Sequence, residues 1–440
     1  MTGPRVLVAA KRLDPEASSE GICTARFVYA VSEAGTPVAV LTGDEAATES
    51  SLRADLPWLT GPLRHCTTLP PSPTRGGHRI RVAVDLAGTA VDGHPTWYRR
   101  SVEAWRGALE SALAEEPPDV LVTRGAGGGF EPHLATLSLD PDVPWVAHYH
   151  DPWPASRWPD PYRAPRTRAM RLQERGHERI LRRADALTFP SARLRDWVVG
   201  GDTGLLAKSH VVPHSLDPWP SPPGIDGDLV AGALDRPFTL VHAGTLLRHR
   251  RIDPLVEAVA TFVTGDHERA GATRLVLAGP VNATGTEGPS TDGPGPELVA
   301  ALEASGVVRR HEGRVSRATA RALVEGATAA VLIEAPGAES PFFPAKLTDY
   351  VTAGRPVLAL SPRESVASDL MGEAHPLRVA PDDVTGVVTA LERLWEAAAR
   401  GTTDTLRIDP ARTADLSPPN IARAFAGVLD AVTAPTRSRP

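Results

Sequence analysis

The sequence predicts an α/β fold divided into two domains. At 440 residues the chain is longer than one hydrophobic core usually serves, so two domains are expected. Short apolar runs suited to buried parallel strands alternate with amphipathic helical segments. The chain opens with an apolar strand at Arg5–Ala10, a polar loop that contains Gly21, and a helix expected over Ile22–Ala34. This order of elements is typical of a Rossmann-like domain, which binds ligands at the carboxyl edge of its sheet.

The rest of the first domain, residues 1–216, continues this alternation. Strands are expected at Pro37–Thr42, Ile80–Leu86, Asp119–Thr123 and Trp145–Tyr149, and a helix at Thr96–Ala114. A Gly-x-Gly-x-Gly pattern occurs in RGAGGGFEP, after the Asp119 strand. These glycines lie in mid-domain and no acidic ribose partner follows a strand at the right distance, so we interpret the segment as a flexible loop rather than a cofactor loop.

The second domain is expected over residues 238–416. Asp217–Pro237 is rich in Pro and Gly and lacks periodicity, so we interpret it as the interdomain linker. A strand at Phe238–His242 opens the domain, and a helix follows that is capped by Asp253 and carries Pro254 in its first turn. Residues 417–440 contain a last helix, which in folds of this kind usually packs back on the first domain.

Composition and charge exclude several classes of protein. The net charge of −6 gives no reason to expect nucleic acid as a partner. Only Cys23 and Cys66 occur, without metal-ligand spacing around either, which disfavours a disulfide framework or structural zinc and suits the reducing cytosol. We find neither a signal peptide nor an apolar run of membrane-spanning length, and expect a cytoplasmic protein. The excess of Arg over Lys is typical of a GC-rich bacterial genome.

One stretch, Ala329–Leu360, combines a strand, a loop, a helix that follows Pro344, and a second strand. Lys346 lies in the first turn of that helix, where a cation opposes the helix dipole unless an anion is bound there. Asp349 shares a helix face with Lys346, which suits a carboxylate that holds sugar hydroxyls beside a phosphate site. The alternative is a solvated helix start with an ordinary surface ion pair.

This stretch resembles the donor-site motif of retaining GT-B glycosyltransferases of family four. Pro344–Leu347 matches a Pro-x-Lys-Leu variant of the motif, and Gly354–Val357 matches its Gly-x-Pro-Val ending. Asp349 replaces the second Glu of the family pattern, while Pro341 occupies the position of the first and Glu339 is displaced by two residues. HVVPHSLD resembles another family segment, with His214 in place of Asn.

The resemblance extends over nearly the whole chain and implies a fold and a reaction. The fold would be two Rossmann-like domains facing each other across a cleft. The reaction would be a hexosyltransferase-type transfer, with retention of configuration, from a UDP- or GDP-linked sugar to a hydroxyl or amine on a small-molecule or glycan acceptor. No cofactor is implied. The rivals are a sugar-nucleotide epimerase of the same fold and a non-catalytic two-domain sugar-binding protein, which would require export.

The resemblance also assigns residues to the donor site. Alignment on Gly244, Leu246 and Pro254 favours Arg250, among Arg248, Arg250 and Arg251, as the phosphate ligand. Gly313 and Arg314 are expected near the base or the phosphates. Gly21 either lets the backbone approach a diphosphate or is a plain turn glycine. The donor set predicted from the motif is Gly21, Gly244, Arg250, Gly313, Lys346, Leu347 and Asp349.

His150 is the third residue, with Arg250 and Lys346, that we expect to be catalytic. It follows a predicted strand in AHYHDPWP, where the family commonly has a His-Asp pair facing the cleft, and would contact the transferred sugar or the incoming hydroxyl. A structural histidine and a zinc ligand, with His148 and Asp151, are the alternatives. The Asp-x-Asp at Asp140 precedes a strand instead of following one, so we predict no essential metal.

The segment Arg157–Arg183 is basic and contains a predicted helix. Its arginines could contact an anionic membrane peripherally, or form a solvated face, which the small number of apolar residues in the helix favours.

Overall fold

The computed structural model describes residues 3–43, 48–66, 85–86, 88–91, 93–127, 129–219, 224–247, 249–280 and 296–434. The chain forms two compact units. Unit 1 comprises Met1–Ser215 together with Asp415–Pro440, and unit 2 comprises Leu216–Ala414. No helix in the described residues is both long enough and apolar enough to cross a bilayer.

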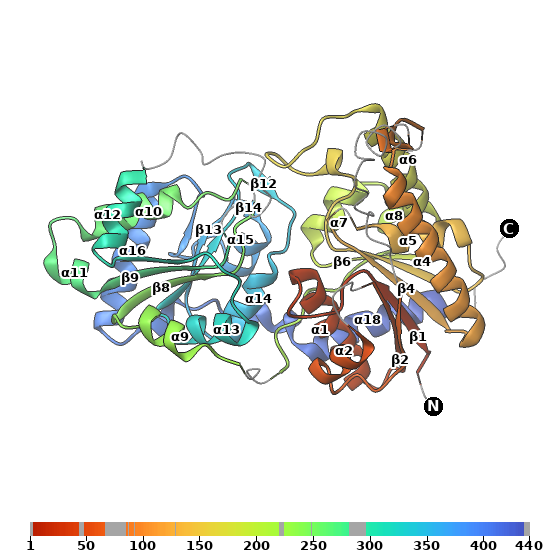
Figure 1. The fold of residues 1–440 in the computed structure, drawn as a ribbon, viewed down its shortest axis with the longest axis horizontal. Coiled ribbons are helices and arrows are strands. Elements are labelled where there is room, and N and C mark those ends of the chain that lie inside the picture. Colours follow the sequence, from red (N-terminus) through yellow and green to blue (C-terminus); the bar gives the residue numbers. More distant parts are fainter. Residues whose placement is uncertain are drawn as a thin grey trace, which may run out of the picture. The chain divides into compact units, whose positions relative to one another are not determined.

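In the described part of unit 1, parallel strands form a sheet in the order β3-β2-β1-β4-β5-β6-β7 (Figure 1). The order reverses between β1 and β4, so the loops after these two strands meet at the topological switch point, where α/β sheets bind ligands. The strands are β1 Val6–Ala10, β2 Val38–Thr42, β3 Leu63–His65, β4 Val120–Gly125, β5 Trp145–Tyr149, β6 Ala186–Phe189 and β7 Ser209–Val211.

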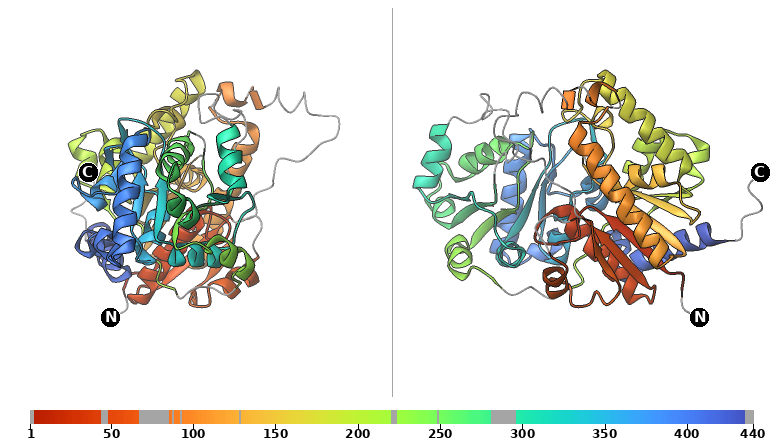
Figure 2. Two further views of the ribbon diagram at one scale, coloured as in Figure 1. Left: turned by 90° about the vertical axis from the view of Figure 1, so that its left-hand side faces the viewer. Right: turned by 45° about the vertical axis from the view of Figure 1, so that its right-hand side comes forward.

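Helices cover both faces of this sheet. They are α1 Ser19–Glu33, α2 Glu49–Asp55, α4 Thr96–Glu115, α5 Glu131–Leu139, α6 Arg168–Arg183, α7 Ala192–Val199, α8 Thr203–Leu206 and α18 Pro418–Thr433, with a 3-10 turn at Ala155–Arg157. Helices α4 to α7 pack their apolar residues on one face, where Trp105 and Trp145 are fully buried. On the other face α18 packs against α1 (Figure 2). Phe27 of α1 meets Phe425 of α18 edge to face, with ring centroids 4.9 Å apart.

Unit 2 repeats the architecture with a sheet in the order β10-β9-β8-β11-β13-β15. Its strands are β8 Phe238–Ala243, β9 Thr273–Ala278, β10 Val308–His311, β11 Ala329–Ile333, β13 Val357–Leu360 and β15 Arg378–Val379, and β12 Glu339–Ser340 pairs with β14 Glu364–Ser365. Its helices are α9 Gly227–Ala233, α10 Asp253–Val263, α11 His267–Ala272, α12 Pro296–Ala304, α13 Arg317–Gly326, α14 Ala345–Thr352, α15 Val366–Met371, α16 Val384–Ala399 and α17 Pro410–Thr413, with 3-10 turns at Thr403–Leu406 and Ala414–Leu416. The switch point here lies between β8 and β11.

The strands that the sequence predicts at the starts of both units are confirmed within two residues, because continuous apolar runs identify strands buried on both faces. Other boundaries differ. The first helix begins at Ser19, before the predicted Ile22, since Ser18 caps it by accepting a hydrogen bond from the Gly21 N–H. The strand predicted at Ile80–Leu86 falls largely outside the described residues, and its described end, 85–86, is helical.

The predicted linker, Asp217–Pro237, is wrong as a description of this segment. It contains α9, which Asp226 caps, and it belongs to unit 2. The Asp217 carboxylate forms ion pairs with Arg317 at 3.0 Å and with Arg321 at 3.5 Å. Both arginines belong to α13, so these contacts fix the segment to that helix. Side-chain anchors of this kind leave no periodic apolar pattern in the sequence.

Candidate active site

The predicted donor residues of unit 2 gather at its switch point. Gly244 ends β8, Arg250 follows in the β8–α10 loop, and Lys346 and Asp349 lie on α14, which follows β11. Gly244 has φ +110°, and a Cβ added there would approach Lys346 Cε to 2.7 Å. The positive φ favours glycine at this position, and the absence of a Cβ leaves room for the lysine side chain beside the backbone.

A second glycine, Gly279, supports this arrangement. It ends β9 with φ +133°, and a Cβ there would meet the Gly244 carbonyl carbon at 2.7 Å. The Gly244 N–H donates to the Ala278 carbonyl at 2.6 Å, and the Gly279 N–H donates to the His311 carbonyl at 2.8 Å. The carboxyl ends of β8, β9 and β10 are thereby tied together.

Lys346 is a cation held in an unfavourable setting. Its Nζ donates to the Thr245 carbonyl at 3.0 Å. Desolvation and, to a smaller extent, the Arg250 guanidinium lower the pKa of Lys346, Asp349 opposes both effects, and the resulting pKa is about 7. An anion bound beside Lys346 and Arg250 would relieve this repulsion. The predicted anion site at the start of α14 thus has a physical basis in the structure.

Arg250 differs from its neighbours in the β8–α10 loop. Arg251 forms an ion pair with Asp253 at 3.0 Å, and Arg248 lies outside the described residues. Asp253 is the first residue of α10 rather than its cap, because its carboxylate is held by Arg251 while Ile252 takes the capping position. Within the described part of the chain, Arg250 Nε is buried without a hydrogen-bond acceptor. A buried donor of this kind is available to a ligand.

Two residues of this site were missed at the sequence level. Glu334, at the end of β11, is buried and accepts hydrogen bonds from Ser340 at 2.9 Å and from Ser361. Desolvation raises the pKa of Glu334, while the hydrogen bond from Ser361 and the positive charge of Arg250 act in the opposite direction. Tyr350 is fully buried, accepts the Ala243 N–H at 3.4 Å and donates to the Val331 carbonyl, which anchors α14 on β8 and β11. The period of α14 marks Tyr350 as a core residue but gives no sign of these bonds.

The structure does not bring every predicted donor residue to this point. Leu347 is fully buried and its N–H donates to the Pro344 carbonyl at 2.9 Å, so in this state it anchors the helix. Gly313 is exposed beyond β10, which β9 separates from β8. Gly21 lies in unit 1, within the first turn of α1, where a Cβ would meet the Asp14 carbonyl oxygen at 2.0 Å. Close backbone approach does require glycine there, but the approaching group is the chain itself.

His150 lies at the carboxyl end of β5, in a cluster that the sequence did not predict. Its N–H donates to the Gly125 carbonyl at 2.8 Å, and its ring lies 4.5 Å from that of His214. The ligand atoms of Cys23, His150 and His214 all lie within 4.8 Å of one another. Desolvation lowers the pKa of His150, with Asp151 opposing and Arg124 adding to the effect, so the imidazole is neutral near pH 7.

The zinc site considered from the sequence combined His150 with His148 and Asp151, but these two residues do not join His150 in the cluster. His148 contacts Thr188 Oγ1 at 3.0 Å, and the Asp151 carboxylate accepts the Gly127 N–H at 2.8 Å. Cys23 and His214 approach His150 instead, from segments far apart in the chain. The one sequence signal was His214, which stands where the resembled family has Asn.

The described residues of the Gly-rich segment form a hydrogen-bonded turn rather than a flexible loop. The Gly129 N–H donates to the Ala126 carbonyl at 2.7 Å, and Gly127 has φ +51°. Just before the turn, Arg124 is buried, donates to Thr24 Oγ1 at 3.2 Å and lies over the Phe27 ring at 4.8 Å. Asp140, of the Asp-x-Asp sequence, is bound by Arg183 after the end of α5.

Residues 65–219 match the family model Glycosyltransferase Family 4. A comparison with curated proteins gave no match.

Solved structures share the fold over nearly the whole chain. The trehalose-6-phosphate phosphatase N-terminal domain of Candida albicans superposes with a TM-score of 0.64 at 13% identity, covering 98% of this chain and 97% of that one. A UDP-forming α,α-trehalose-phosphate synthase of Burkholderia xenovorans, in complex with glucose-6-phosphate, superposes with a TM-score of 0.57 at 13% sequence identity. The match covers 97% of this chain and 100% of that one. An E. coli structure described as trehalose-6-phosphate bound with UDP-2-fluoro glucose superposes with a TM-score of 0.56 at 12% sequence identity. The match covers 97% of this chain and 98% of that one.

These similarities confirm the fold expected from the donor-site motif, two Rossmann-like units of the GT-B type. The family match agrees with the activity that the motif implied. The chain therefore has the GT-B fold, and part of its first unit is similar to glycosyltransferases of family four.

Proposed function

We propose that the protein transfers a hexose from a nucleoside-diphosphate sugar, UDP- or GDP-linked, to a hydroxyl or amine of a small-molecule or glycan acceptor, with retention of configuration. One observation carries the assignment of the donor site. Arg250 and Lys346 approach each other at the switch point of unit 2, although their charges repel and desolvation already disfavours the charged lysine. Two such cations at a sheet edge are suited to the diphosphate of a donor.

The same pair would assist the chemistry. Cleavage of the bond between sugar and phosphate builds negative charge on the departing diphosphate, and preorganised cations stabilise that charge in the transition state. Arg250 and Lys346 hold the diphosphate, and Asp349, one turn along α14, accepts hydrogen bonds from sugar hydroxyls. Loss of one such cation typically costs about 2.7–4 kcal/mol.

Proteins with the same fold support the substrate classes. One of the structures described above is bound with UDP-2-fluoro glucose and another is in complex with glucose-6-phosphate. A nucleotide-linked hexose as donor and a small sugar derivative as acceptor are therefore the first substrates to test. His150 would contact the transferred sugar or the acceptor hydroxyl through a neutral imidazole. The donor is a substrate, and the proposal includes no cofactor.

A thermal-shift screen of nucleotide sugars tests the donor assignment. A ligand at 100 times its dissociation constant adds about 2.7 kcal/mol to the free energy of unfolding, which is readily detected. The stabilising donor is then incubated with candidate acceptors and the products are separated. A glycosylated acceptor supports the proposal, whereas an isomerised donor formed without any acceptor would identify an epimerase.

Donor binding should depend on pH through Lys346. The pKa of the free lysine is lowered to about 7, and a bound diphosphate favours the charged form and raises that pKa. Only the protonated lysine binds strongly. Affinity for a nucleoside-diphosphate sugar, whose phosphates do not titrate near neutral pH, should therefore be constant below pH 7 and fall as the pH rises above it, with proton uptake on binding. Calorimetry in buffers of different ionisation enthalpy measures this uptake. Lys346→Arg, which stays charged, should lose the dependence, and a wild-type profile in that variant would contradict the assignment.

Turnover should survive a chelator. Cations occupy the place at which a metal would neutralise the diphosphate, so no metal is required there. EDTA should leave the initial rate within about twofold, which is well below the loss expected for a missing electrostatic group. If EDTA abolishes activity and added Mn²⁺ or Mg²⁺ restores it, the site needs a hard cation. Restoration by Zn²⁺ alone would point to the cluster of Cys23, His150 and His214.

The cytosol is the proposed location. Both cysteines, Cys23 and Cys66, are buried thiols that form no disulfide, which accords with a reducing compartment.

A further inference from the structure

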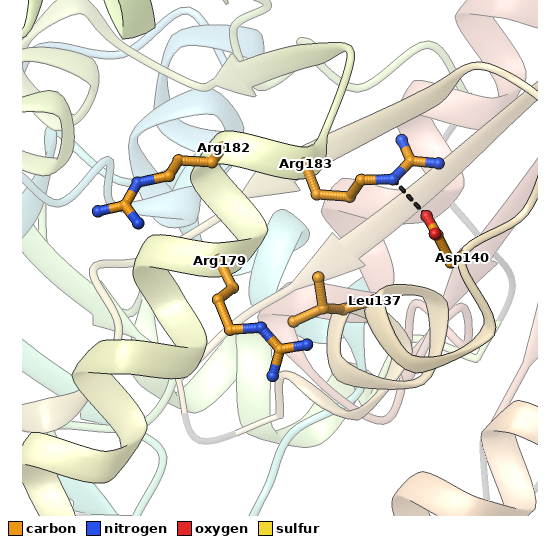
Figure 3. Close-up of a pocket in the computed structure, with 5 residues that line it drawn as sticks. All are labelled: Leu137, Asp140, Arg179, Arg182 and Arg183. Atoms are coloured by element: carbon orange, nitrogen blue, oxygen red, sulfur yellow. Dashed lines mark hydrogen bonds and ion pairs between the residues drawn. The ribbon is translucent and has the colours of Figure 1, made fainter.

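A groove runs along unit 1 between α4, α5 and α6. Its larger part has a volume of about 730 Å³, within the range of small-molecule sites. Apolar side chains of all three helices line it, among them Val102, Leu134 and Leu172. A second hollow of about 380 Å³ shares Leu137 and Arg179 with the first, so the two are continuous. Figure 3 shows the second hollow, with the arginines of α6 beside the end of α5.

Cations surround these apolar side chains. The arginines that line the two hollows are Arg99, Arg100, Arg175, Arg179, Arg182 and Arg183, and the acidic residues are Glu103 and Asp140. Both carboxylates are already engaged, Glu103 by Arg106 at 3.0 Å and Asp140 by Arg183. In the described part of the chain, no carboxylate lies within ion-pair distance of Arg100, Arg175 or Arg179. A chain with a net charge of −6 thus concentrates positive charge on one groove.

Exposed apolar side chains occur at the same place. Val91, which lines the groove, is 71% exposed, and Trp97, in the first turn of α4, is 42% exposed. A solvated arginine face, the alternative favoured from the sequence, would leave the surface between its arginines polar. Here that surface is apolar. Arginine beside exposed tryptophan and aliphatic side chains is the composition of surfaces that lie at a lipid–water interface.

We propose that this groove docks unit 1 on an anionic phospholipid surface. Lipid phosphates would bind Arg175 and Arg179, while Val91 and Trp97 would enter the interfacial region. Each arginine near an anionic bilayer contributes roughly a fivefold gain in partitioning. Arginine is suited to the contact because its planar guanidinium binds phosphate through two parallel hydrogen bonds. The proposal assigns a surface for lipid and is independent of the chemistry proposed for unit 2.

Vesicle sedimentation of the full chain tests it. Protein should sediment with phosphatidylcholine vesicles that contain phosphatidylglycerol and not with phosphatidylcholine alone, and high salt should release it. The double variant Arg175→Gln, Arg179→Gln should bind about 30-fold more weakly, as expected for two lost arginines. Arg168→Gln, Arg171→Gln removes equal charge from α6 at residues that do not line the groove, and should change binding only slightly.

Three results would overturn the proposal. They are absence of binding to the anionic vesicles, an equal loss in both double variants, and binding of inositol hexaphosphate in the groove without any binding to vesicles, which would indicate a site for a soluble polyanion. The melting temperature of the full chain serves as the folding control, and both it and nucleoside diphosphate affinity should be unchanged in both variants. Because lipid and nucleotide are measured separately, failure of the membrane proposal and failure of the proposed function give different results.

Discussion

Lys346→Met is expected to weaken nucleoside diphosphate binding by about 100-fold or more, while affinity for the bare nucleoside stays within a few fold. The ammonium of Lys346 and the guanidinium of Arg250 act on the same anion, and removal of one cation at such a site typically costs about 2.7–4 kcal/mol. The side chain of methionine keeps the apolar stem that crosses Gly244, so the packing of the loop is retained. Calorimetry below pH 7, where the wild-type lysine is charged, gives both affinities.

Lys208→Met is the matched control. The Nζ of Lys208 donates to the carbonyls of Arg182 and Ala184 in unit 1. The predicted diphosphate ligands belong to unit 2, so removal of the Lys208 charge should leave diphosphate affinity unchanged. A second control is Arg251→Gln, because Arg251 is already paired with Asp253, whereas Arg250→Gln should reproduce the defect of Lys346→Met. Equal loss of diphosphate and nucleoside affinity in Lys346→Met would show a collapsed loop instead of a lost charge.

His150→Ala is expected to lower the turnover number on the order of 100-fold while diphosphate affinity stays within a few fold. A group that contacts the transferring sugar or the acceptor acts mainly in the transition state, so its removal changes kcat more than ground-state binding of the diphosphate. Steady-state rates and calorimetry on the same preparation separate the two quantities.

His148→Ala provides the comparison, two residues earlier on the same strand. His148 is buried against Thr188 in the sheet, so its loss should lower the melting temperature and damage all functions together. If His150→Ala behaves in this way, its role is structural. A His150→Ala protein that is fully stable and fully active would show that His150 has neither role.

The sequence predicts best those parts of the fold that depend on residues close together in the chain. A continuous apolar run such as VLVAA in β1 can only be buried on both faces, and the spacing around Leu347 and Tyr350 marks the inner face of α14. The motif around Lys346 is equally local, because a helix start, a lysine and a following carboxylate are neighbours in the chain.

The parts that could not be predicted depend on distant segments. Gly279 matters because its backbone touches Gly244, and Glu334 matters because Ser361 returns to it from a later strand. Cys23 and His214 carry no pattern that links them to His150; only the fold brings them together. Gly21 illustrates the opposite error, since the sequence indicates that something approaches it closely but not that the approaching group is Asp14.

The position of α18 has a consequence for how the protein is made. Unit 1 is built from two separated stretches, and α18 packs against β4, β6 and α1 on one face of the sheet, where Phe425 contacts Phe27 of α1. During synthesis the whole of unit 2 therefore leaves the ribosome before unit 1 can bury that face. Unit 2 is one contiguous stretch and can complete its fold first. Until α18 is made, unit 1 exposes the apolar surface that α18 later covers, and such a surface is prone to aggregation. A circular permutant that places residues 415–434 ahead of β1 would reverse this order of assembly, and its yield of soluble protein on rapid expression would measure how much the delay costs.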